Sequence, residues 1–323
     1  MDRRREILTL VLLVSACSHT ASPNAAPPAG ANDEAGAAGR PSSGEDAASE
    51  TGGIAKTETI TVTAGGQPRI IIVHSPPNLN APASLVFNLH GSGGTAADQE
   101  AFSGMDQAAD ARGFIAAYPQ GAIALGGGFA WNVPGQPLVD GSAVPPGAAD
   151  DVVFFAQAIA ALAQRYPVDP SRIYAAGFSG GARMASQLGC DLSGMVAAVA
   201  PVAGLRFPSP CNGVRPVPVV AFHGTADTTN PYDGGGPPYW TYSVQTAAEE
   251  WAMHDGCGLT PSTSQPASGV QLTSYVGCAG VATVELYTIA GAGHEWPGAA
   301  QQTSAIDATA VMWTFFSAHP LPP

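Results

Sequence analysis

The stretch IYAAGFSGGARMASQLGC, from Ile173 to Cys190, changes character in its middle. Its first half is rich in small and β-prone residues, its second half has the composition of a helix, and GFSGG (Gly177 to Gly181) lies at the junction. Glycines at such a junction indicate either a simple tight turn or a strained strand-to-helix turn that exposes Ser179 as a nucleophile. The choice depends on whether the chain also supplies a base and an acid.

A serine hydroxyl is a weak nucleophile until a base takes its proton, and histidine is the usual base near neutral pH. His294 lies in the glycine-flanked loop IAGAGHEWPG and is the predicted base. His90 and His223 each end a predicted strand before a glycine, where a structural hydrogen-bonding role is at least as well supported. His254 lies on a predicted helix, and His319 lies close to the last residue of the sequence.

The acid that orients the base should follow a strand between the serine and the histidine, in the chain order Ser, Asp, His. Asp227 in HGTAD meets this requirement. Asp233 in PYDGGG is the alternative, although it is also explained as a turn residue. Asp150 and Asp151 precede the serine and are better explained as capping residues of the helix that follows them.

Hydrophobic periodicity past Lys56 predicts strands that alternate with helices. This order implies an α/β fold with a mainly parallel central sheet and helices on both faces. Two hairpin-like strands come first and suggest a mixed edge, and the Gly- and Pro-rich stretch 121–149 is predicted to be a long loop. The predicted strands include 57–64, 69–76, 83–94, 114–121, 172–178, 195–204, 217–224, 270–277 and 283–289. The predicted helices include 98–113, 150–166, one that follows Ser179, 243–256 and 304–319.

The N-terminal region resembles a processing signal rather than part of the fold. Residues 1–17 combine three arginines with a short apolar stretch and end in VSAC, which resembles the lipobox of bacterial lipoproteins and predicts lipidation of Cys17. An ordinary secretory signal that happens to contain a cysteine is the alternative. Residues 18–56 are mostly Ala, Gly, Pro, Ser and acidic residues, so we expect a disordered tether before a single domain over 57–323. A lipid anchor would hold the protein to a membrane without crossing it.

Composition excludes one class of partner. The 323 residues carry a formal net charge of −13, and only 11% of them are charged. Because phosphate binding depends on clustered Lys and Arg, we expect no nucleic-acid partner.

Four cysteines remain in the predicted domain: Cys190, Cys211, Cys257 and Cys278. An even number in an exported protein indicates disulfides, and four cysteines allow three connectivities. Pairing Cys190 with Cys211 and Cys257 with Cys278 is favoured because each bond closes a short segment, but the sequence alone does not select it. A zinc site is the weaker alternative, since no pair has C-x-x-C spacing.

Motifs in a fixed order support a family assignment. They include LHGSGG, AADARGFIAAYPQG, ADDVVFF, VDPSRIYAAGFSGGARMA, AAVAPVAG, VPVVAFHGTAD, WAMHDGC and GAGHEWPG, spread from about Leu85 to Gly298. In these motifs the chain resembles α/β-hydrolases of the polyhydroxybutyrate depolymerase and feruloyl or acetylxylan esterase family, the first carbohydrate esterase family. The resemblance also supports the two short-range disulfide pairs.

The resemblance implies a serine esterase without metal or organic cofactor. Ser179 would be the nucleophile, His294 the base and Asp227 the acid, in agreement with the residue-level argument. The oxyanion would be held by the backbone N–H groups of Gly180 and, in the HGSGG loop, Ser92. Many relatives carry Asn after the serine where this chain has Gly180, which affects only fine positioning.

The implied substrates are short or aromatic acyl esters, such as feruloyl or acetyl esters of polysaccharides or hydroxybutyrate oligomers. Trp131, Trp240 and Trp296 lie in predicted loops, as does Tyr239, and the three tryptophans are predicted to contact substrate. The same triad could instead transfer the acyl group to a sugar or, less plausibly, cleave peptides. A non-catalytic binding lipoprotein on the same fold is the alternative from another class.

Overall fold

The computed structural model describes residues 54–79, 81–299 and 304–322. The predicted signal peptide 1–17 with Cys17, and all of the predicted tether except its last three residues, lie outside the described residues. In the described part of the chain, no helix is both long and apolar enough to cross a membrane.

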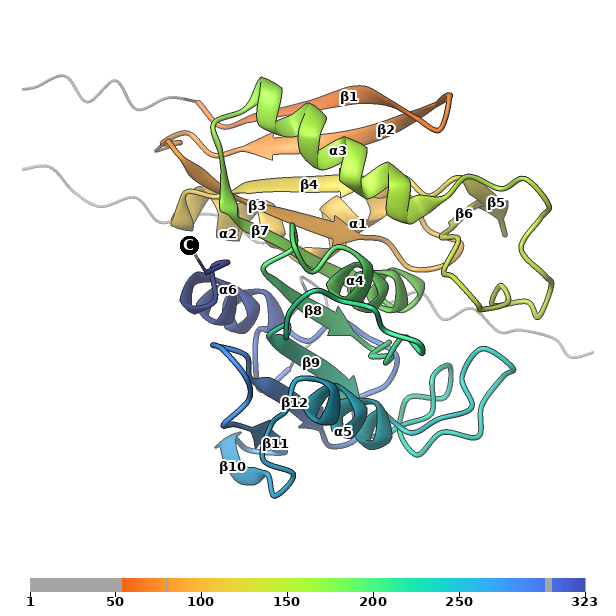
Figure 1. Ribbon diagram of the computed structural model, residues 1–323, viewed down its shortest axis with the longest axis vertical. Helices are drawn as coiled ribbons and strands as arrows, with labels where there is room; N and C mark the ends of the chain where they lie inside the picture. The colour runs from red at the N-terminus through yellow and green to blue at the C-terminus, as the bar shows by residue number, and fades with distance from the viewer. Residues whose placement is uncertain (1–53, 80, 300–303, 323) are drawn as a thin grey trace, which may run out of the picture. The chain divides into compact units, whose positions relative to one another are not determined.

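A ten-stranded sheet runs through the described domain in the order β1-β2-β4-β3-β7-β8-β9-β12-β11-β10 (Figure 1). Its six central strands, β4 to β12 in that order, are parallel. Antiparallel pairs flank them, β1 and β2 at one edge and β11 and β10 at the other. The strands are β1 Lys56–Ala64, β2 Gln67–Ser75, β3 Ala83–Leu89, β4 Ile115–Pro119, β7 Val168–Phe178, β8 Ala198–Val202, β9 Val219–Gly224, β10 Ser262–Ala267, β11 Val270–Tyr275 and β12 Val284–Ile289.

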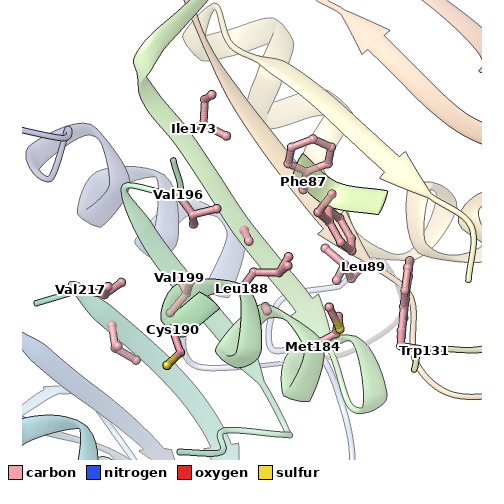
Figure 2. Close-up of a cluster of buried hydrophobic side chains, with 14 of the residues drawn as sticks. Phe87, Leu89, Trp131, Ile173, Met184, Leu188, Cys190, Val196, Val199 and Val217 are labelled. Atoms are coloured by element: carbon pink, nitrogen blue, oxygen red, sulfur yellow. The ribbon is translucent and has the colours of Figure 1, made fainter. Parts of the chain in front are cut away.

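Helices cover both faces of this sheet (Figure 1). They are α1 Ala96–Ser103, α2 Met105–Arg112, α3 Asp151–Arg165, α4 Gly180–Asp191, α5 Val244–His254 and α6 Ala308–Ala318. Successive strand residues point to opposite faces, so Phe87 packs in one apolar cluster with α3, α4 and α5, while Val86 packs in another with α2 and α6. Figure 2 shows the first cluster, with Met184 and Leu188 of α4 lying over the sheet. The predicted α/β-hydrolase architecture is confirmed.

Three local predictions need correction. The predicted helix over 98–113 is two helices, because Gly104 adopts a left-handed φ of 66° between α1 and α2. The predicted loop 121–149 contains a small hairpin, β5 (Ile123–Leu125) and β6 (Gly128–Ala130). Strand β10 was also missed, since its exposed and largely polar residues lack an alternating apolar pattern.

Both predicted disulfides are present. Cys190–Cys211 ties the end of α4 to the loop before β9, and Cys257–Cys278 ties the loop after α5 to the loop after β11. The cysteine sulfurs are therefore bonded to each other, and the zinc alternative is wrong.

Candidate active site

Ser179 lies at the sharp turn between β7 and α4. Its φ of 54° and ψ of −113° are strained for a residue with a Cβ atom, and its N–H donates to the carbonyl of Val202 at 2.9 Å. A Cβ atom at Gly177 would stand 2.5 Å from the carbonyl of Gly181, and one at Gly181 would lie 2.6 Å from the carbonyl oxygen of His90. These glycines let β7, α4 and the end of β3 approach closely. This close approach explains why glycines surround the serine in residues 173–190.

Asp227 and His294 meet although 67 positions separate them in the chain. Asp227 follows β9 and its carboxylate is fully buried, whereas His294 follows β12 and its side chain is 18% exposed. His294 Nδ1 lies 2.8 Å from Asp227 Oδ2, which leaves Nε2 as the ring nitrogen free to accept a proton. The imidazole ring lies 4.8 Å from the ring of Phe178, the residue before Ser179. Ser179, Asp227 and His294 therefore lie at the same edge of the sheet.

The Asp227 carboxylate is held in its ionised form. Burial opposes ionisation, but hydrogen bonds from His223, from His294 and from the N–H of Asn230 together lower the pKa of Asp227 well below its usual range. Oδ1 accepts the N–H groups of Thr229 and Asn230, both at 2.8 Å. A carboxylate held in this way keeps the Nδ1 proton of His294 in place.

The other sequence candidates lie elsewhere. Asp233 is exposed in a turn, and the acid that reaches His294 is Asp227. His254 contacts the neighbouring carboxylate of Asp255 instead. Asp150 caps α3 as predicted, accepting from the N–H of Val153, but Asp151 is a buried partner of Arg69 rather than a cap.

The HGSGG loop after β3 packs directly on the elbow. A Cβ atom at Gly180 would overlap the Ser92 side chain and would lie 3.0 Å from the Ser92 nitrogen, so Ser92 lies directly against the first residue of α4. The hairpin missed from the sequence supports this loop: Gly93 N–H donates to the carbonyl of Phe129, and Phe129 N–H donates to the carbonyl of Gly94.

His90 anchors the start of the same loop. Its Nδ1 faces the carbonyl of Gly91 at 2.8 Å, and its Nε2 accepts the N–H of Gly121 at 2.9 Å. Because Nε2 is an acceptor, the proton lies on Nδ1 and the ring is neutral. Burial lowers the pKa of His90 to about 4, so the ring stays neutral at ordinary pH.

A cavity of about 390 Å³ opens beside the elbow. The loop from His90 to Gly94 forms one wall, and Phe102 of α1 and Phe178 form apolar walls. Their rings lie 5.4 Å apart. Phe178 occupies the variable position of the G-x-S-x-G pattern and could have been suspected from the sequence, but no sequence signal singled out Phe102.

The prediction that Trp131, Trp240 and Trp296 contact substrate is wrong. All four loop aromatics are buried: Trp131 is 3%, Tyr239 4%, Trp240 0% and Trp296 0% exposed. Their polar atoms are used inside the protein, since the Trp131 indole donates to the carbonyl of His90 and the Trp296 indole to the hydroxyl of Thr309. They brace the loops around the site instead of offering a surface to a ligand.

Known proteins resemble this chain in sequence and in fold. Feruloyl esterase B of Piromyces equi is 35% identical over 239 residues, which cover 70% of this chain but only 42% of that protein. The putative esterase NocK of Nocardia uniformis subsp. tsuyamanensis is 32% identical over an alignment covering 92% of this chain and 90% of that protein. The structure of an acetyl xylan esterase from Aspergillus awamori superposes with a TM-score of 0.58 at 17% identity, covering 81% of this chain and 99% of that one. No protein-family model matches the chain.

The parallel sheet, the strained serine turn and the aspartate and histidine after later strands define an α/β-hydrolase. The relatives add the finer assignment. The chain belongs to the same esterase family as these relatives and is a carboxylic ester hydrolase.

Proposed function

We propose that Ser179, His294 and Asp227 form the catalytic triad of an esterase for short or aromatic acyl esters. The observation that carries the proposal is the 2.8 Å contact between His294 Nδ1 and the buried carboxylate of Asp227, made with the imidazole against Phe178. This arrangement fixes the tautomer of the base and sets its ring against the residue that precedes Ser179.

In the proposed reaction, Ser179 Oγ attacks the ester carbonyl while His294 Nε2 takes its proton. The C–O bond to the alcohol then breaks, and His294 returns the proton to the departing alkoxide oxygen. Water, deprotonated by His294, then attacks the acyl carbon; the bond to Ser179 Oγ breaks, and His294 returns the proton to Oγ, which releases the acid and free serine. The N–H groups of Ser92 and Gly180 hold the oxyanion in both halves, and each such donor contributes about 10² to 10³ in rate.

The cavity supports the substrate class. Ligand pockets typically measure roughly 300 to 1,000 Å³, and about 390 Å³ lies near the lower limit. Apolar walls of Phe102 and Phe178 suit an acetyl, hydroxybutyryl or single-ring feruloyl group better than a long acyl chain. The name of the feruloyl esterase relative agrees with such a substrate.

A variant comparison tests the activity and the substrate class together. Purified wild type and Ser179→Ala should be assayed on methyl ferulate, acetylated xylan, hydroxybutyrate oligomers and p-nitrophenyl esters of increasing chain length. We expect Ser179→Ala to lose several powers of ten in kcat and wild type to prefer the short and aromatic esters. Near-normal turnover by Ser179→Ala contradicts the triad, and a preference for long-chain esters contradicts the substrate class.

We further propose that the protein is exported and anchored by lipid on Cys17. The sequence of residues 1–17 supports this, and the two disulfides indicate an oxidising compartment. Cells expressing wild type should incorporate labelled fatty acid into the protein, and Cys17→Ser should abolish incorporation and release it from membranes. Wild-type protein without label contradicts the anchor while leaving the esterase proposal untouched.

A further inference from the structure

His223 is a second histidine at the acid, and the proposed triad does not use it. It lies near the end of β9 with a side chain that is 0% exposed. Its Nε2 lies 2.8 Å from the carbonyl oxygen of Asn230 and 3.2 Å from Asp227 Oδ2. Because both neighbours are acceptors, Nε2 carries a proton and donates it to them.

The other ring nitrogen identifies the protonation state. Among the described residues, His223 Nδ1 is buried without a hydrogen-bond partner. A proton there would be a buried donor with nothing to bind, which is costly. The hydrogen-bond network therefore assigns His223 as the neutral tautomer with its proton on Nε2.

Aromatic packing fixes the imidazole in this orientation. The ring stacks on Trp240 with centroids 5.6 Å apart and planes 26° apart. The Trp240 indole is in turn held by a 2.8 Å hydrogen bond to the carbonyl of Pro231. One function of the buried Trp240 is thus to hold the ring that faces the acid.

The Asp227 carboxylate is surrounded by donors. Backbone N–H groups of Thr229 and Asn230 fix Oδ1, while His294 and His223 share Oδ2. The backbone donors are part of the turn, so His223 is the side chain, besides the base, that determines where Oδ2 points. Without it, a buried oxygen would lose a donor and the carboxylate could turn away from His294.

We propose that His223 is a positioning residue of the hydrolase, donating Nε2–H to Asp227 so that the carboxylate holds Nδ1 of His294 and leaves Nε2 of that ring for the reaction. The inference rests on the proposed triad. Its effect falls on the geometry of the base, and hence on kcat, because His223 lies behind the acid and is fully buried.

Two substitutions separate the donor from the ring. His223→Gln places an amide N–H near the position of Nε2 but loses the ring, whereas His223→Phe keeps a ring on Trp240 but loses the donor. We expect His223→Phe to lower kcat between ten- and a hundredfold, as misplacement of a catalytic group does, with KM changed less than about twofold because no substrate contact is lost. His223→Gln should retain most of the wild-type kcat. Should His223→Phe not fold, His223→Met provides the donor-free comparison.

The outcomes separate this inference from the proposed function. A folded donor-free variant with wild-type kcat overturns it, and so does a His223→Gln enzyme as impaired as His223→Phe, which would assign the effect to the ring. Ser179→Ala is assayed alongside these variants. Hydrolysis that persists in Ser179→Ala overturns the triad itself. Hydrolysis lost in Ser179→Ala but unchanged in His223→Phe overturns only the role of His223.

Discussion

The dipeptide His-Gly occurs at two strand ends beside the site, His90-Gly91 after β3 and His223-Gly224 at the end of β9. Both histidines are 1% exposed. In both places the glycine admits a neighbouring segment, since a Cβ atom at Gly224 would lie 2.5 Å from the carbonyl carbon of Ala292 in the loop after β12, and one at Gly91 would lie 3.1 Å from the ring of Phe178 at the end of β7. In sequence and position the two ends are alike.

Their hydrogen bonds are opposite. At His90 the Nε2 atom accepts a backbone N–H, so the proton lies on Nδ1. At His223 the Nε2 atom faces a carboxylate and a carbonyl, so the proton lies on Nε2. The first ring holds the loop of the proposed oxyanion site, and the second holds the acid. The segment that a histidine contacts, rather than its sequence neighbours, therefore decides what the ring does.

The largest expected effect is at the acid. Asp227→Ala should lower kcat by about three to four powers of ten, because His294 then loses the partner that fixes its tautomer. Asp233→Ala, at the exposed carboxylate of the same loop, is the matched control and should stay near wild type in steady-state assays. If Asp233→Ala were the more damaging change, the β9 end would not supply the acid.

At the start of α4, which packs on the loop after β3, Gly180→Ala should lower kcat by about 10² to 10³. The added methyl overlaps the Ser92 side chain, and displacing the HGSGG loop removes an oxyanion donor. Gly194→Ala is the control, since its new Cβ atom would meet Val214 at an ordinary 3.5 Å. Equal kcat in both variants would show that contact between elbow and loop does not matter for turnover.

The smallest effect is a pH dependence of stability at His90. The pKa of His90 is about 4 in the folded protein and about 6.5 in the unfolded chain. Between these two pH values, His90 is therefore protonated in the unfolded chain and neutral in the folded protein. The free energy of unfolding should therefore fall as the pH is lowered from 6.5 to 4, by about 3 kcal/mol from this residue. Urea unfolding at a series of pH values measures this dependence. Between pH 6.5 and 4, the free energy of unfolding should fall less steeply for His90→Gln than for wild type.

His319→Gln is the control for this measurement, because His319 lies outside the loop network and contacts the carbonyl of Phe315. If the free energy of unfolding fell as steeply between pH 6.5 and 4 in His90→Gln as in wild type, the assignment of a buried neutral ring would be contradicted.

Local signals in the sequence sufficed for the class of fold, and they name the residues of the proposed triad. Alternating strands and helices predict the parallel sheet, because each element needs an apolar face of its own period. The glycines around Ser179 predict the elbow, because close backbone approach excludes side chains. Asp227 and His294 were found as residues that follow strands, and the parallel sheet brings their carboxyl ends to one edge.

Only the tertiary structure decided which loop residues face the cavity and which are buried. Trp296 follows His294 by two positions, yet its ring packs near Phe102 and its indole reaches Thr309, contacts made by distant segments. Phe102 lines the cavity from a helix with no chemical motif, and His223 meets Asp227 and Asn230 only because the loop after β9 turns back on the strand end. Periodicity reports the face of a regular element, but a loop side chain has no period, so its burial and its proton are set by whatever the fold packs against it.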